Sequence, residues 1–233
     1  MFKKKITIII CSYNNSRYLK RCLNSVFNQS VSINKFNVIL IDDNSNDRSL
    51  DIANNFKNKN NLKILKNHKN IGLVKSCNRA IKHSKTEFIV RVDSDDYISK
   101  NFIKVFLKYI EKDYDLIFSN YKIIKNKKIK KININKFKFK NLISCSVVLK
   151  KKIINKIGGY RDFLWEEYDL YLRYLKKTKK IFRIKEHVYF YRFHKNNMTK
   201  LSSWKKEAWK QLYKKYSKSD ILYLEKQIKL SKN

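Results

Sequence analysis

The stretch FIVRVDSDDYI, residues 88–98, places three carboxylates directly after a run of apolar, mostly β-branched residues. Such an almost unbroken apolar run is typical of a strand that is covered on both faces of a parallel sheet. Asp93, Asp95 and Asp96 follow it within four positions. Like charges this close repel one another unless a cation or a donor-rich ligand lies between them. The stretch therefore predicts a strand that ends at a functional site.

Similar strand patterns occur upstream, in ITIII (6–10), NVILI (37–41) and, more weakly, LKILK (62–66). Between them, apolar residues recur with helical spacing over 18–27 and 73–81. Strands that alternate with helices predict an α/β fold with a doubly wound, mostly parallel sheet. In such sheets, ligands bind outside the carboxyl ends of the strands.

The other acidic residues also cluster. Asp42 and Asp43 follow the strand predicted at 37–41, so we expect them at the same edge of the sheet as the acids after residue 92. A third cluster begins the helix predicted from the sequence LWEEYDLYLRYLKK, where Asp169 lies four residues before Arg173. We expect Asp169 to form an ion pair on the helix surface, and the helix dipole alone favours acids at this end.

The second half of the chain predicts a helix near 99–112, a strand at 115–119 and a lysine-rich hairpin within 122–141. Residues 202–218 predict an amphipathic helix with aromatic residues on one face and lysines on the other. This helix either docks on the domain or lies on an anionic membrane surface.

Composition limits the alternatives. The chain has 233 residues, enough for one domain, and we place that domain at 1–200 with a helical extension at 201–233. The formal charge is +36, and proline is absent. The lysines reflect either an AT-rich coding sequence or a function in binding anions. The four cysteines form no CxxC pair and predict a reduced, cytosolic protein, and no apolar stretch is long enough to cross a membrane.

The acids favour a divalent metal over a phosphate-binding loop. Neither GxxxxGK nor GxGxxG occurs in the sequence. A diphosphate would therefore need another counter-charge, and the carboxylates of Asp93 and Asp95 are suitable ligands for Mg²⁺ or Mn²⁺, although not for zinc.

Six segments resemble, in this order and spacing, the successive motifs of bacterial family-2 glycosyltransferases of the GT-A fold. The resemblance covers about residues 5–200. The segments are TIIICSYNNSRYLKRCLNSVFNQS, VILIDDNSNDRS, NIGLVKSCNRAI, FIVRVDSDDYI, IGGYRDFLWEEYDLYLR and YRFHKNNMT.

The resemblance implies a nucleotide-sugar-binding half at 1–98 and an acceptor-side half at 99–200. Asp43 would accept a hydrogen bond from the imide of the nucleotide base, which favours a UDP-sugar donor. The other residues implied in donor binding are Cys11, Tyr13, Asn14, Arg79 and Ser94. Those implied in binding Mn²⁺ or Mg²⁺ are Asp93, Asp95 and His194, although a histidine after a strand is also common as a structural residue.

The resemblance also implies an inverting transfer to a hydroxyl group, with an acidic residue as the general base at the start of the acceptor helix. The family commonly has ED there, whereas this chain has EE. The matching residue is Glu167, and Glu166 is an alternative base. The expected acceptor is a saccharide or a lipid-linked saccharide in surface polysaccharide or glycolipid assembly. We expect a cytoplasmic location, with attachment to the inner face of the plasma membrane as an open alternative.

Other classes of protein explain less of the sequence. A nucleotide-sugar pyrophosphorylase needs a glycine-rich loop after the first strand, and CSYNNSRY has no glycine. A nucleic-acid-binding protein would explain the positive charge but leaves the acid clusters without a purpose, so no nucleic acid is expected as a partner. An inactive nucleotide-sugar-binding relative stays open because of the EE pair and Cys11.

Overall fold

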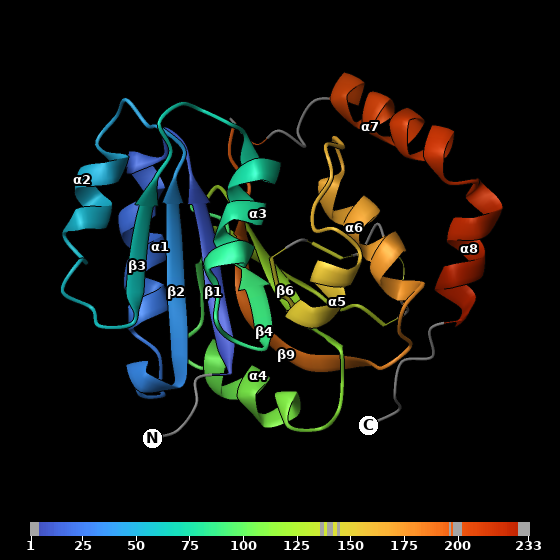
Figure 1. Cartoon of the computed structure of the whole chain (residues 1–233), viewed down its shortest axis with the longest axis horizontal. Helices are drawn as coiled ribbons and strands as arrows, with labels where there is room; N and C mark the ends of the chain where they lie inside the picture. The colour runs from blue at the N-terminus through green and yellow to red at the C-terminus, as the bar shows by residue number, and fades with distance from the viewer. Residues whose placement is uncertain are drawn as a thin grey trace.

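The four predicted strands of the first hundred residues lie side by side and parallel in the computed structural model of the protein (Figure 1). The structure describes residues 5–135, 138, 142–143, 145–195, 197 and 202–227. The strand order is β3-β2-β1-β4. Their bounds are Leu62–Lys66 for β3, Phe36–Asp42 for β2, Ile6–Ser12 for β1 and Phe88–Arg91 for β4. All four strand predictions are confirmed to within two residues.

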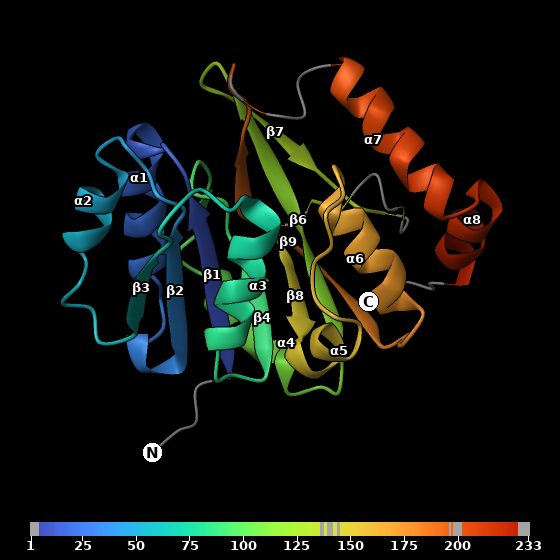
Figure 2. The same cartoon turned by 45° about the horizontal axis from the view of Figure 1, so that its top comes forward.

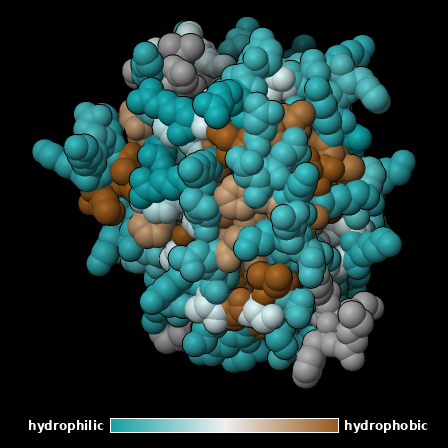
Figure 3. Space-filling view, turned by 90° about the vertical axis from the view of Figure 1, so that its left-hand side faces the viewer, coloured by the Kyte–Doolittle hydropathy of each residue, from teal (hydrophilic) through white to brown (hydrophobic). Residues whose placement is uncertain are grey.

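The strand order places helices on both faces of this parallel half. From β1 the chain moves outward through β2 to β3, then crosses back to β4. Because crossovers between parallel strands are right-handed, this reversal puts α1 (Ser16–Phe27) and α2 (Ser49–Asn54) on one face and α3 (Leu73–His83) on the other. The predicted apolar faces of α1 and α3 are buried against the sheet, while the outer face over β3 and α2 is mostly hydrophilic (Figure 3). The sheet is therefore doubly wound, as predicted.

The sheet continues past β4 through the order β8-β6-β9-β5, with β7 paired to β6. In this half, β6 and β9 are parallel, whereas β8 is antiparallel to both of its neighbours. The sequence did not predict this antiparallel insertion. The bounds are Tyr97–Ile98 for β5, Leu116–Lys125 for β6, Lys128–Ile132 for β7, Val147–Lys150 for β8 and Ile181–Arg192 for β9.

The β6–β7 pair confirms the lysine-rich hairpin, although residues 136, 137 and 139–141 of the predicted segment lie outside the described residues (Figure 2). The remaining helices are η1 (Ile33–Lys35), α4 (Phe102–Ile110), α5 (Lys151–Lys156), α6 (Glu166–Leu175), α7 (Ser202–Lys215) and α8 (Lys218–Gln227).

The C-terminal region differs from its prediction in one respect. The amphipathic stretch at 202–218 is not one helix, because α7 ends at Lys215 and α8 begins at Lys218. Both helices lie beside α6 (Figures 1 and 2). Within the described ranges, no helix is both long and apolar enough to cross a bilayer.

Candidate functional site

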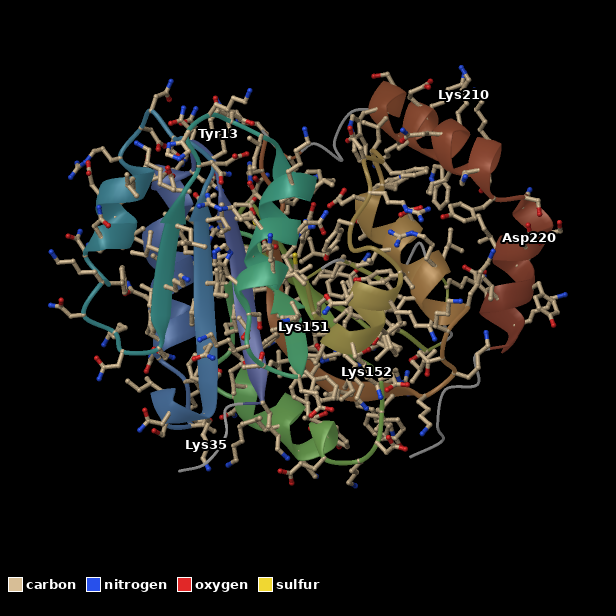
Figure 4. All side chains as sticks on the ribbon, viewed as in Figure 1. Tyr13, Lys35, Lys151, Lys152, Lys210 and Asp220 are labelled. Atoms are coloured by element: carbon tan, nitrogen blue, oxygen red, sulfur yellow. The ribbon has the colours of Figure 1, made fainter. Side chains whose placement is uncertain are left out.

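The loops after β1, β2 and β4 meet at one edge of the sheet, as the acid clusters predicted. The parallel register pairs Ser12 of β1 with Asp42 of β2 at this edge. Asn15 Nδ2 donates a hydrogen bond of 2.7 Å to Ser94 Oγ, and the Asn14 amide donates one of 3.0 Å to Ser45 Oγ. Tyr13 lies at the same edge and is exposed (Figure 4). These contacts join the three loops that the sequence assigned to the donor.

Asp43 is buried and organises the loop before α3. Its carboxylate accepts hydrogen bonds from Asn67 Nδ2 at 2.6 Å and from the amides of Ile71 and Gly72 at 2.9 Å each. Gly72 begins α3 with a φ of +84°, in the left-handed region that glycine tolerates. Asp43 thus holds the entry to α3, and its predicted contact with a nucleotide base stays a prediction.

The three acids after β4 have three different partners. Asp93 pairs with Arg91 through Nε at 2.7 Å, and Asp95 Oδ2 lies 2.8 Å from Nε2 of His194. Asp96, which is 1% exposed, accepts hydrogen bonds from the Tyr189 hydroxyl and the amide of Arg192. The sequence alone had left Asp96 without a role, and the structure shows that it fastens the loop to β9.

Burial and mutual repulsion dominate the electrostatics of this loop. Burial raises the pKa of Asp95, the charge of Asp93 adds to that rise, and the hydrogen bond with His194 opposes it. Burial also raises the pKa of Asp96 well above its usual value, together with the charges of Asp95 and Asp93. The loop therefore concentrates negative charge that a cation would stabilise.

The residues present fit a divalent cation best at Asp95 and His194. Their facing oxygen and nitrogen atoms are partly exposed at the sheet edge, whereas Asp93 is already paired with Arg91. Asp93 also lies in a cluster with Asp96 and Cys145, whose potential ligand atoms lie within 4.8 Å of one another. That cluster suits Mg²⁺ or Mn²⁺ poorly, because a thiol is too soft a ligand and Asp96 is buried with its own partners.

The two glutamates of the third acid cluster differ in their surroundings. Glu166 is buried and accepts a hydrogen bond of 2.8 Å from Nη1 of Arg91, so this arginine joins β4 to the start of α6. The side chain of Glu167 is partly exposed where it lines the cavity. The surrounding protein nevertheless desolvates its carboxylate and raises its pKa well above the usual value, and the neighbouring Glu166 raises it further. Of the pair, Glu167 is therefore the carboxylate prepared to accept a proton.

One cavity of about 560 Å³ connects these groups. Its polar side contains Arg91, both glutamates and the DSD turn, and Cys11 also lines it. Its apolar side comes from β6, β9, α6 and α7 and includes all three tryptophans of the chain. The predicted site residues that line it are Cys11, Asp93, Ser94, Asp95, Glu166 and Glu167; those that do not are Tyr13, Asn14, Asp43, Arg79 and His194.

Arg79 is linked to Asp43 through the side chain of Asn67, which bonds to both residues. Its guanidinium donates hydrogen bonds to the Lys66 carbonyl at 2.8 Å and to the side chain of Asn67. These contacts fasten α3 to the end of β3. The geometry supports a structural role, while the predicted approach to the donor stays untested.

The predicted ion pair of Asp169 with Arg173 is confirmed, but its predicted location on the helix surface is wrong. Asp169 does pair with Arg173 at i+4, but its side chain is 0% exposed and also accepts a hydrogen bond from the hydroxyl of Tyr216. Arg173 donates further hydrogen bonds to the carbonyls of Ile157 and Gly159. The pair is buried because the segment after α7 folds over this face of α6, a contact distant in sequence.

The apolar face of α7 is docked on α6. The ring of Trp165, the residue before α6, lies 4.7 Å from that of Trp204, and Tyr168 lies 5.6 Å from Trp209. Ala208 is fully buried. The structure thus shows the docked alternative for this helix; membrane binding stays a prediction.

Sequence reasoning assigned Arg91 no role, and it placed Trp204 and Trp209 on the apolar face of a helix without connecting them to the site. The signal for Arg91 was present, because a single cation within the buried strand FIVRV needs a carboxylate partner. Its partner Glu166 lies 75 residues away, so the pairing required the fold. No sequence signal indicated that the tryptophans line a cavity, because an amphipathic helix has the same residue pattern whatever it packs against.

The fold thus places a DSD turn at the carboxyl edge of a doubly wound sheet, in one cavity with a carboxylate at the start of the facing helix. Comparison with known sequences identifies the class of protein to which such a chain belongs. The model of the family "Glycosyl transferase family 2" matches residues 7–164. The chain belongs to this family.

Comparison with individual proteins shows which members of the family the chain is similar to. It is 32% identical over 171 residues to the poly(ribitol-phosphate) beta-N-acetylglucosaminyltransferase TarS of Staphylococcus aureus, covering 72% of this chain and 29% of the relative. It is 42% identical over 96 residues to the poly(ribitol-phosphate) beta-glucosyltransferase of Bacillus spizizenii, covering 40% of this chain and 15% of the relative. The chain thus spans less than a third of the length of these two relatives.

Solved structures confirm the fold. A crystal structure of S. aureus TarS residues 1–349 in complex with UDP-GlcNAc superposes with a TM-score of 0.73 at 24% identity, covering 83% of this chain and 60% of that one. The mannosyltransferase PcManGT from Pyrobaculum calidifontis, in complex with GDP-Man and Mn²⁺, superposes with a TM-score of 0.74 at 12% identity. This superposition covers 97% of this chain and 69% of that one. The GT-A-type fold predicted from the sequence is therefore confirmed.

Proposed function

We propose that the protein transfers a sugar from a UDP-sugar to a hydroxyl group of a saccharide or polyol acceptor, with inversion at the anomeric carbon. One observation carries this proposal: the DSD turn and Glu167, which the sequence separates by more than seventy residues, line the same cavity. A donor diphosphate near the turn and an acceptor near α6 would thus meet within one enclosed space.

The proposed donor end lies where β1 and β4 end. Cys11 of β1 and Ser94 of the DSD turn line the cavity there, and the side-chain amide of Asn15 donates a hydrogen bond to Ser94 Oγ. We favour uridine because a relative of this fold was solved with UDP-GlcNAc. Another was solved with GDP-Man, so the fold alone leaves the base open and the Asp43 contact needs a direct test.

Glu167 is the proposed general base. It would take the proton of the acceptor hydroxyl as that oxygen attacks the anomeric carbon from the side opposite the nucleotide. Glu166 is unsuited to this role, because its carboxylate is buried and held by Arg91. Arg91 in turn holds Asp93, so one guanidinium fixes the geometry of the acids at the donor end and at α6.

Asp95 and His194 are the residues we propose to hold Mn²⁺ or Mg²⁺, with Asp93 beside them. When bound, such a cation neutralises charge on a departing diphosphate. The mannosyltransferase of similar fold, solved with Mn²⁺, supports this choice of metal.

The proposed setting is the assembly of a surface polymer. Relatives named for action on poly(ribitol-phosphate) support a polyol or saccharide acceptor of this kind. We also propose the division of the chain into a donor half at 1–98, an acceptor half at 99–200 and a helical extension at 201–233. A cytoplasmic location, with or without attachment to an anionic membrane surface, belongs to the same proposal.

The test is a thermal-shift panel of UDP, dTDP, GDP and CDP, each with and without Mn²⁺, on the wild type and on Asp95→Asn. A ligand at about 100 times its Kd stabilises the protein by about 2.7 kcal/mol, or roughly 5 to 10 °C for a chain of this size. We expect a Mn²⁺-dependent rise with UDP that Asp95→Asn abolishes. A protein that no nucleotide stabilises, or a product that keeps the anomeric configuration of the donor, would refute the proposal.

A further inference from the structure

The cavity has two chemically different ends. The end near β1 and β4 carries the DSD turn and Arg91. The other end is a wall of aromatic rings contributed by β6, β9, α6 and α7. The rings are Tyr121, Trp165, Tyr168, Tyr191, Phe193, Trp204 and Trp209. Glu166 and Glu167 follow directly on Trp165 and so lie at the start of the helix that carries part of this wall.

The aromatic wall is held in a fixed geometry. The rings of Trp165 and Trp204 meet edge to face, with an interplanar angle of 79° and centroids 4.7 Å apart. Trp209 contacts Tyr168 at 5.6 Å. Gln211 Oε1 accepts a hydrogen bond of 2.8 Å from the amide of Leu164, which ties α7 to the segment before α6. Trp204 and Trp209 remain partly exposed although they pack on α6, so their rings face the cavity as well as the core.

Flat, partly exposed indole rings suit the C–H face of a sugar or the carbon chain of a polyol, which packs on aromatic faces while its hydroxyls point elsewhere. The cavity also contains two cations among its described lining residues. Arg91 is neutralised by Asp93 and Glu166, whereas Lys205 has no carboxylate partner in the described part of the chain. A cation without a partner beside an aromatic wall favours an acceptor that carries an anionic group.

We propose that α7 forms the acceptor subsite, in which Trp204 and Trp209 stack on a saccharide or polyol unit and Lys205 contacts a phosphate attached to it. This assignment rests on the proposed transferase function, and it makes α7 a determinant of acceptor specificity. The acceptor unit would lie against the start of α6, where Glu167 meets its hydroxyl.

All three tryptophans of the chain line this cavity, so intrinsic tryptophan fluorescence reports on it without a label. We would titrate the protein, loaded with UDP and Mn²⁺, with a ribitol-phosphate oligomer and, separately, with a neutral glucose oligomer. The variants are Trp204→Leu and Lys205→Gln. The matched control is Lys206→Gln, which changes an exposed lysine of the same helix that does not line the cavity. The thermal shift on addition of UDP and Mn²⁺ shows that each variant is folded and binds the nucleotide. Hydrolysis of UDP-GlcNAc without acceptor is measured for the wild type and for Lys206→Gln.

The ribitol-phosphate oligomer should change the fluorescence of the wild type and bind about tenfold or more tightly than the neutral oligomer. Trp204→Leu and Lys205→Gln should each weaken that binding about tenfold, while Lys206→Gln binds the oligomer and hydrolyses UDP-GlcNAc as the wild type does. Equal binding of the two oligomers, no fluorescence change with either, or undiminished binding by both variants would overturn the α7 assignment. Loss of UDP-GlcNAc hydrolysis in the wild type would instead count against the proposed function.

Discussion

At the scale of the residue, the site depends on giving neighbouring carboxylates different environments. Glu166 is fixed as a charged partner of Arg91, and Asp96 is buried as an anchor for β9. Glu167 and Asp95 keep partly exposed oxygens facing the cavity and the sheet edge. Residues of one chemical type therefore divide, through their contacts alone, into carboxylates bound within the fold and carboxylates left accessible to a ligand.

The first prediction at this scale concerns pH. Since its enclosed position and Glu166 raise the pKa of Glu167, the protonated form persists above the usual range of glutamate. A general base must be deprotonated, so kcat/KM should rise with pH through a limb centred well above pH 4.5. The same shift makes folding less favourable as pH rises from the unfolded pKa through the folded one, because the native state binds the proton more tightly.

The check is a pH profile of kcat/KM for the wild type, Glu167→Asp and Glu167→Gln. Glu167→Asp should keep the limb at a lower rate, and Glu167→Gln should lose activity by a factor of about 10² to 10⁴. Glu207→Gln, an exposed change on α7, serves as the control. A limb at the ordinary carboxylate pKa would contradict the assignment of Glu167.

At the scale of the element, the turn between α5 and α6 decides where the glutamates lie. Gly158 and Gly159 have φ values of +78° and +70°. Asn78 of α3 holds the turn by two hydrogen bonds of 2.9 Å with the backbone of Tyr160. The turn thus joins α3 to the segment that leads into α6, the helix that carries Glu167.

The side chain of Asn78 lies against Gly159 and not against Gly158, so the two glycines should differ in how well they tolerate a side chain. Gly158→Ala should cost about 1 kcal/mol of stability, because only its left-handed backbone is strained and no atom lies within 4 Å of a Cβ there. Gly159→Ala should cost about 1–3 kcal/mol more, since its Cβ would overlap the side chain of Asn78. Urea denaturation of both variants measures the difference; equal losses would mean that the Asn78 contact carries little energy.

At the scale of the whole molecule, one buried arginine connects the two halves of the fold. Arg91 lies in β4, between the parallel strands and the antiparallel insertion, and bonds to both the DSD turn and α6. Burial alone would lower the pKa of Arg91, but the charges of Asp93 and Glu166 help to raise it instead. Removing it would leave two carboxylates without a counter-charge.

Arg91→Met should therefore cost about 3–5 kcal/mol of stability. Adding Glu166→Gln should restore part of that loss, because one uncompensated charge disappears. Lys5→Met, which breaks the exposed pair with Glu111, should cost less than about 1 kcal/mol and is the matched control. Equal losses in Arg91→Met and Lys5→Met, by denaturant titration, would contradict the proposed linkage.

The sequence by itself determined the parallel half of the fold and the meeting of two acid clusters at its edge. Unbroken apolar runs define buried strands, and strands parallel in one sheet must end at the same edge, so Asp42, Asp43 and Asp93 had to converge. The tertiary structure decided which acids are structural, that Asp169 is buried under Tyr216, and that α7 completes the cavity. Those outcomes depend on contacts between residues 39 to 99 positions apart, and a local pattern cannot specify what a side chain meets across the fold.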